Sequence, residues 1–176
     1  MQIEPFGGLS DPLKLRAPAS THKKVIVELN DRKSFRGYLN PTRLGQLDPL
    51  DLLTKDGEHQ ELPLSRIRSI YFVRDFEEDF QPERRAFLSR PKLDGLWLRL
   101  RFLDGQSLEG VVPNDLLSLL DNGIQITPPD LNSNTDRIFV PRTALSEVTV
   151  LGVVGIARRK PAAAAAGQPT LFDEAE

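Results

Sequence analysis

The stretch VELNDRKSFRG (Val27 to Gly37) decides the fold, because it recurs later in the chain as LRFLDGQSLEG (Leu100 to Gly110). Both copies alternate apolar with polar residues, carry turn-forming residues in the middle and end on a glycine. This pattern is typical of a β-hairpin. A glycine inside the second strand of each hairpin allows that strand to bend sharply, as small barrels require.

A second pair of segments repeats in the same order. The segment LPLSRIRSIYF (Leu62 to Phe72) returns in the second half of the chain as VPRTALSEVTV (Val140 to Val150). Two matched segments in the same order, with nearly the same spacing, indicate an internal duplication.

The alternation also suggests a register for each hairpin. We expect an apolar pair on one face and a pair of opposite charges on the other. These pairs are Leu29 with Phe35 and Glu28 with Arg36 in the first hairpin, and Phe102 with Leu108 and Arg101 with Glu109 in the second.

Short apolar runs separated by frequent turn signals favour an all-β fold. Further strands are predicted at 50–54, 66–73, 123–127, 137–141 and 147–153, whereas 115–122 fits either a helical turn or a strand. The predicted organisation is an N-terminal arm (1–19), a first small barrel (20–75), a connector (76–94), a second barrel (95–156) and a disordered tail (157–176). Within the connector, Pro82 would begin a short helix that carries Arg84, Phe87 and Leu88, and Pro91 would end it.

The hairpins resemble the first motif of the Sm/Lsm family, which includes the bacterial RNA chaperone Hfq. The residues that carry the resemblance are Val25, Val27, Leu29, Asp31, Phe35, Gly37 and Leu39, and in the second copy Leu98, Leu100, Phe102, Asp104, Gly105, Leu108, Gly110 and Val112. The resemblance implies two tandem Sm-like (SH3-like) barrels, each of five bent strands, with edges that can form rings. The tandem arrangement also resembles uncharacterised bacterial two-repeat proteins.

The sequence departs from the RNA-binding members of that family. Arg43 stands near the expected aspartate, and Asp51 stands where an asparagine would be usual. The arginine–glycine pair of the second family motif is absent from both repeats. The RNA pocket of the family is therefore not carried over to this chain.

Composition and motifs argue against several classes of protein. The chain has no cysteine and no signal peptide is recognised, so a cytoplasmic protein is expected. The net charge of −2 argues against non-specific DNA binding, although a local basic patch remains open. No catalytic or cofactor-binding motif occurs, which predicts a protein that is not an enzyme and binds no cofactor. His22 and His59 fit surface positions, and the carboxylates of Asp75, Glu77, Glu78 and Asp79 fit a solvated linker better than a metal site.

Basic residues offer one binding hypothesis. A nucleic-acid patch could be formed by Arg32, Lys33, Arg36, Arg43, Arg66 and Arg68. Cationic side chains grouped in this way can follow a phosphate backbone. The alternative is ordinary solubilising charge, because acidic residues accompany each cluster.

The C-terminal stretch GQPTLFDE (Gly167 to Glu174) offers another hypothesis. Its core, QPTLF, resembles the peptide by which bacterial replication and repair proteins dock onto the DNA sliding clamp. Gln168 can donate and accept hydrogen bonds, while Leu171 and Phe172 can fill an apolar pocket. The alternatives are a tail that folds back over its own barrels and a terminal apolar pair without a binding role, in a protein of unknown function. The sequence thus predicts a non-enzymatic binding or scaffold module, as a monomer or dimer, with a ring oligomer as the alternative.

Overall fold

The computed structural model describes residues 21–46, 48–76, 80, 84–115 and 117–155. In this part of the chain the fold is all-β, as predicted, and regular structure is confined to strands and short 3₁₀ turns. No helix among these residues is long and apolar enough to cross a membrane.

The strands fall into two sets of five, one for each predicted repeat. The first repeat contains β1 (Lys23–Leu29), β2 (Ser34–Leu39), β3 (Leu50–Thr54), β4 (His59–Leu62) and β5 (Ile67–Val73). The second contains β6 (Gly95–Phe102), β7 (Ser107–Val112), β8 (Gly123–Ile126), β9 (Thr135–Pro141) and β10 (Leu145–Val154). The 3₁₀ turns are η1 (Pro41–Arg43), η2 (Leu64–Arg66), η3 (Leu117–Leu120) and η4 (Arg142–Ala144), so residues 117–120 form a helical turn rather than a strand.

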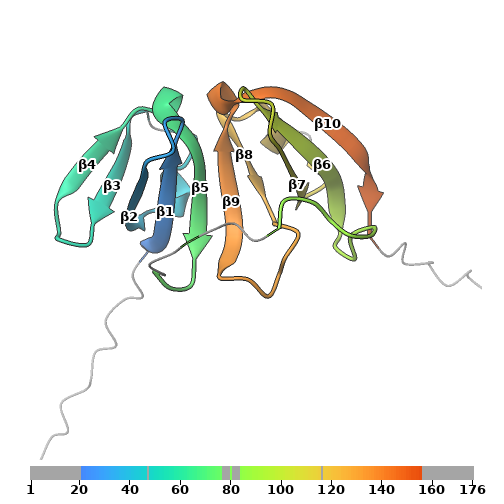
Figure 1. Ribbon diagram of the computed structural model, residues 1–176, viewed down its shortest axis with the longest axis horizontal. Coiled ribbons are helices and arrows are strands. Elements are labelled where there is room, and N and C mark those ends of the chain that lie inside the picture. The colour runs from blue at the N-terminus through green and yellow to red at the C-terminus, as the bar shows by residue number, and fades with distance from the viewer. Residues whose placement is uncertain (1–20, 47, 77–79, 81–83, 116, 156–176) are drawn as a thin grey trace, which may run out of the picture.

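The two repeats share a sheet instead of forming two separate closed barrels. The larger sheet has the order β4-β3-β2-β1-β5-β9-β8, and the smaller one has the order β10-β6-β7. Strand β9 of the second repeat therefore pairs with β5 of the first, at the centre of the body (Figure 1). A single bridge between Val111 and Thr127 links β7 to β8. Strand β9 keeps its pairing with β8 on one side and pairs with β5 on the other, and neither sheet closes on itself.

The hairpin register differs by two residues from the prediction. Val27, not Leu29, lies opposite Phe35, and Leu100 lies opposite Leu108. The expected pairing of Glu28 with Arg36 is wrong, because Arg36 faces Ile26. In the second hairpin, Glu109 faces Arg99 instead of Arg101.

The turns explain this shift. Each hairpin closes with a three-residue loop, in which the N–H of Leu29 donates to Lys33 O and that of Phe102 donates to Gln106 O. Such loops place their third residue in the left-handed region. That residue is Arg32 (φ 69°) in the first repeat and Gly105 (φ 83°) in the second. The predicted pairs centre the first turn on Arg32, whereas the observed pairs centre it on Asp31.

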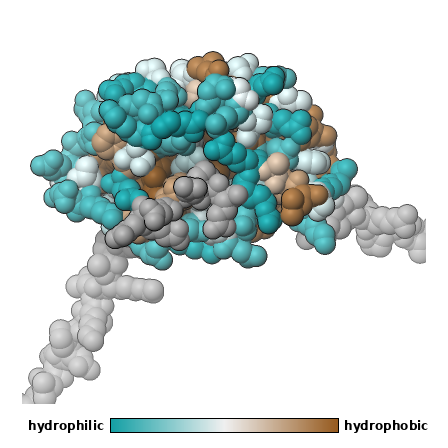
Figure 2. Space-filling view, in the orientation of Figure 1, coloured by the Kyte–Doolittle hydropathy of each residue, from teal (hydrophilic) through white to brown (hydrophobic). Residues whose placement is uncertain are grey.

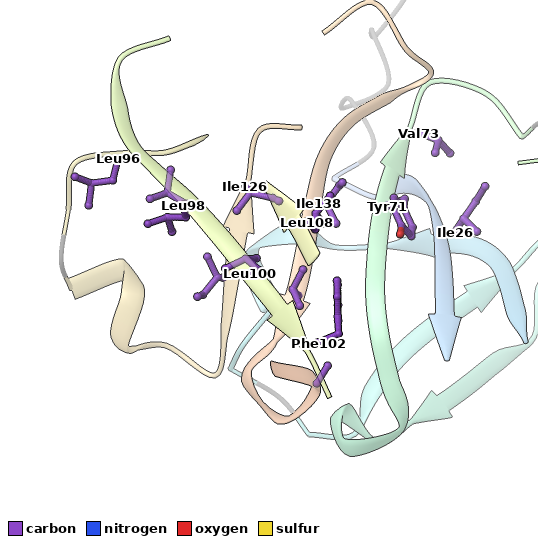
Figure 3. Packing of buried hydrophobic residues seen from close by; sticks show 14 residues of the cluster. Ile26, Tyr71, Val73, Leu96, Leu98, Leu100, Phe102, Leu108, Ile126 and Ile138 are labelled. Carbon is purple, nitrogen blue, oxygen red and sulfur yellow. The ribbon is translucent and has the colours of Figure 1, made fainter. Parts of the chain in front are cut away.

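Two hydrophobic cores meet at the shared strands. One cluster fills the first repeat, and it includes Phe139, which β9 contributes from the second repeat. The other fills the second repeat, and it includes Ile26, Tyr71 and Val73 from the first (Figure 3). Since each core contains side chains from both repeats, neither repeat can complete its core alone.

The described residues of the connector, 84–94, form bends and irregular segments without a helix, so the predicted helix is wrong for this part of the chain. The N–H of Glu109 donates to Arg85 O at 2.7 Å, and the N–H of Phe87 donates to the Glu109 carboxylate at 3.1 Å. A backbone whose polar groups pair with β7 in this way cannot also make helical hydrogen bonds. Pro82 lies outside the described residues.

We predict that Gly37→Ala and Gly110→Ala each lower the free energy of unfolding by about 1–3 kcal/mol. A Cβ at residue 37 would overlap the Leu53 carbonyl oxygen, and one at residue 110 would lie 2.6 Å from Ile126. The matched control is Gly152→Ala, because a Cβ there would meet no atom within 4 Å. Thermal melts of the three variants check this. Melting temperatures for the first two that equal that of the parent would contradict the close packing of the bent strands.

Candidate functional site

Three adjoining cavities surround the η1 turn. The histidine cavity (about 260 Å³) is lined by His22, Leu39, Asn40, Arg43, Leu50, Asp51 and His59. The lysine cavity (about 280 Å³) is lined by Lys23, Lys24, Pro41, Phe72, Val73, Gln125, Asp136 and Arg137. The seam cavity (about 240 Å³) is lined by Pro41, Leu44, Gly45, Val112, Pro113, Asp121, Gly123, Ile124, Gln125 and Phe139. The latter two share Pro41 and Gln125, so they meet where the repeats join.

The histidine cavity brings together the two histidines of the chain. Nδ1 of His59 lies 2.9 Å from one Asp51 carboxylate oxygen and 3.0 Å from the other. Both side chains are largely exposed, at 67% for His59 and 51% for Asp51. Within the described ranges, no three His, Asp or Glu side chains are placed to hold a metal ion.

The lysine cavity is lined by basic residues of both repeats. Nζ of Lys24 donates to Asp75 at 2.7 Å and to Arg74 O at 2.9 Å. The hydrogen bond with Asp75 raises the pKa of Lys24 above its ordinary value, despite partial desolvation. Lys23 and Arg137, on β1 and β9, are exposed at its rim. Its wall therefore combines cations, of which Lys24 is held by Asp75, with the Asp136 carboxylate and with an amide, Gln125, that can donate and accept hydrogen bonds.

Two of the six residues of the predicted nucleic-acid patch lie elsewhere, in a junction cluster formed by Glu28, Arg32, Arg68 and Asp104. Arg68 is 5% exposed and donates to Asp104 at 2.7 Å, and Arg32 donates to the same carboxylate at 2.7 Å. Arg32 also pairs with Glu28 at 3.0 Å. The guanidinium of Arg68 stacks on Phe102 at 3.9 Å from the ring centroid. The cluster thus ties the hairpin turn of the second repeat to the first.

The carboxylates of the junction cluster are satisfied by several donors. Glu28 accepts hydrogen bonds from Ser69 and Tyr71, each at 3.2 Å. Burial and the adjacent Glu28 carboxylate raise the pKa of Tyr71 to about 12. Desolvation acts to raise the pKa of Asp104, but the hydrogen bonds from the Gln106 N–H and Arg68 outweigh it, so this pKa lies below its ordinary value. The charged groups of the junction cluster pair with one another, so we assign them a role in stability.

The other four patch residues are dispersed. Arg43 lines the histidine cavity, and Arg66 is exposed at the end of η2. Nζ of Lys33 lies 3.5 Å from a carboxylate oxygen of Asp31, and Arg36 is half-buried on β2. The hairpin turn and the η1 cavities lie at opposite ends of β1, about 20 Å apart at 3.3 Å per residue. The structure therefore does not gather the six residues onto one surface.

The structure also shows basic residues that the sequence prediction missed. Lys23, Lys24 and Arg137 come together only because β5 pairs with β9. No local signal indicates that pairing, since Lys24 and Arg137 belong to different repeats and lie far apart in the chain. Figure 2 shows one face of the body, where polar side chains cover most of the surface and apolar ones form small patches.

Comparison with known proteins places the chain in a family. The profile of a family of unknown function, DUF6982, matches residues 21–152, which is three quarters of the chain. The chain belongs to this family. Neither a curated protein nor a solved structure matches it.

The DUF6982 match covers the first nine strands and most of β10, so it includes both repeats, the three cavities and the junction cluster. The predicted docking peptide, Gln168 to Phe172, lies outside the match and outside the described residues. The carboxylates predicted to form a solvated linker are described only at Asp75, which pairs with Lys24.

We predict that Asp104→Asn lowers the free energy of unfolding by roughly 1–3 kcal/mol, because the buried Arg68 loses its closer charged partner and keeps only the more distant Glu28. The folded pKa of Asp104 is lowered, so its contribution is complete above its ordinary value of 3.8 and is lost as the pH falls below it. Urea unfolding from pH 7 to pH 3 measures both effects.

The matched control is Asp31→Asn, at the equivalent turn of the first repeat, where the carboxylate pairs with exposed Lys33. We expect a smaller loss there. Equal losses from Asp31→Asn and Asp104→Asn would show that the junction cluster does not hold the repeats together.

Proposed function

We propose that this protein is a non-enzymatic binding module, in which two tandem Sm-like repeats form a body and the C-terminal tail docks onto a partner. The leading partner is the bacterial DNA sliding clamp. The strand order supports the Sm-like relationship, because each repeat runs last–first–second–third–fourth: β5-β1-β2-β3-β4 and, through the Val111–Thr127 bridge, β10-β6-β7-β8-β9.

The observation that carries the proposal is the peptide QPTLF together with its point of attachment. Strand β10 ends at Val154, at the outer end of the body (Figure 1). Twelve residues, 156–167, separate Gly155 from Gln168. A coil of that length spans roughly 17–21 Å. The peptide can therefore enter a pocket on a partner without the repeats touching that partner.

The chemistry of the peptide fits a small mixed pocket. The amide of Gln168 suits a polar recess, and Leu171 and Phe172 suit an apolar one. Burying one leucine and one phenylalanine provides roughly 3–6 kcal/mol before ordering costs. We therefore expect a dissociation constant on the order of micromolar or weaker for a single site.

Titration calorimetry of the full chain with the purified sliding clamp of the same organism tests the proposal. Leu171→Ala/Phe172→Ala should abolish the heat of binding, because it removes both apolar anchors. Thr170→Ala, at a variable position of the peptide, should bind like the parent. Absence of heat with the parent chain at roughly 100 μM clamp would exclude this partner.

A second function, binding of single-stranded nucleic acid, is favoured by the basic rim of the η1 cavities. His22, Lys23, Arg43, His59 and Arg137 surround the turn on two adjoining cavities. These residues come from both repeats, so a phosphate backbone could follow the seam between them. This site differs from the predicted patch in all but Arg43.

For this second function, Arg43→Glu should weaken RNA or DNA binding at least ~10-fold at low salt and reduce the dependence of binding on salt. The charge-matched control is Lys92→Glu, at an exposed residue that lines none of the three cavities. Electrophoretic mobility shifts across a salt series measure the effect. Equal weakening by both variants would indicate a general charge effect, and no shift by the parent chain would remove this function.

A further inference from the structure

The final strand, β10, forms a long free edge. It pairs with β6 on one side and, among the described residues, with no strand on the other; Figure 1 shows it at the outer end of the body. Its ten residues include one charged side chain, Glu147, and no proline. Val148, Val150 and Val153 are 39%, 54% and 60% exposed. Long edges that lack charges and proline recruit further strands.

The equivalent strand of the first repeat, β5, has the same kind of edge, and a further strand, β9, pairs with it. Ile70 and Phe72 on β5 correspond to Val148 and Val150, and they are only 0% and 7% exposed. The difference arises because β9 covers β5 and places Phe139 opposite Ile70. In the second repeat the same apolar positions remain uncovered.

The other free edge, β4, is protected in the usual way. It has only four residues, and His59 and Glu61 are exposed. Glu61 occupies the position in the duplication that Phe139 occupies on β9. If β4 of another copy added to β10, this carboxylate would lie against Val148. A β4 strand of another copy therefore cannot make on β10 the apolar contact that β9 makes on β5.

We propose that two copies of this chain associate through antiparallel pairing of their β10 strands around a two-fold axis at Thr149. This register places Val148 opposite Val150 of the second copy, so the valines of both chains form one apolar cluster. Glu147 then lies opposite Leu151 of the second copy, and no like charges meet. The interface is isologous, as in most homodimers.

The length of the regular strand sets the strength of this dimer. Register shifts lie between Leu145 and Glu147 and between Val150 and Gly152, so the regular run is short. Near the end of β10, Arg90 donates to Val153 O at 2.5 Å and holds the connector there. A short ladder predicts a dissociation constant on the order of micromolar, so dimerisation depends on protein concentration.

Sedimentation velocity of the full chain from roughly 1 to 200 μM tests the proposal. The parent should shift from monomer to dimer, and Val150→Lys should raise the dissociation constant at least ~10-fold, since it places a charge in the apolar cluster. Gln60→Lys, the matched change on β4, should leave the dimer intact. A circular dichroism melt confirms that each variant is folded.

A cysteine variant tests the register, because the chain has no native cysteine. Thr149→Cys should form a disulfide-linked dimer in mild oxidant, whereas Gln60→Cys should not. A parent chain that stays monomeric throughout, as it would if the tail covered β10, would overturn the proposal. So would an oligomer that Gln60→Lys disrupts and Val150→Lys does not. The outcome is independent of clamp docking, which Leu171→Ala/Phe172→Ala tests separately.

Discussion

The pairing of β5 with β9 is the constraint on which the rest of this structure depends. It joins the last strand of one repeat to the fourth strand of the other, and it exchanges side chains between their cores. Phe139 fills the first core, while Ile26 and Tyr71 fill the second. A repeat of this size buries only about 60% of its unfolded surface alone, so the exchange supplies apolar contact that a single repeat lacks.

The shared strands also explain why equivalent residues have acquired different roles. Asp31 bonds within its own turn, whereas its counterpart Asp104 binds the buried Arg68 across the junction. Arg36 of the first repeat corresponds to Glu109 of the second, which is 5% exposed and accepts hydrogen bonds from Arg99, Trp97 and the connector. Each position has adapted to the neighbour that the other repeat presents to it.

The sequence predicts the local elements of the fold well, because they follow from alternation and turn chemistry. The all-β fold and the strand at Leu50–Thr54 are confirmed, and a close approach of neighbouring atoms is found at both predicted strand glycines, Gly37 and Gly110. The duplication stays a prediction. The hairpin register was wrong because a three-residue loop depends on one left-handed residue, which is arginine in the first repeat. The connector and the η1 cavities depend on contacts between distant segments, such as Glu109 with Phe87, that no periodicity encodes. The tail peptide lies outside the described residues and stays a prediction.

The two paired strands β5 and β9 are synthesised at different times, which affects how the chain folds on the ribosome. On the ribosome, Val73 emerges well before Phe139, because most of the second repeat lies between them in the sequence. At about 5–20 residues per second, the first repeat waits for a time on the order of seconds for the aromatic side chain that completes its interior. During that interval the nascent β5 edge is uncovered and can pair with other chains. Translation speed over residues 74–139 therefore sets how long this edge stays uncovered, and chaperones that bind the nascent chain can protect it.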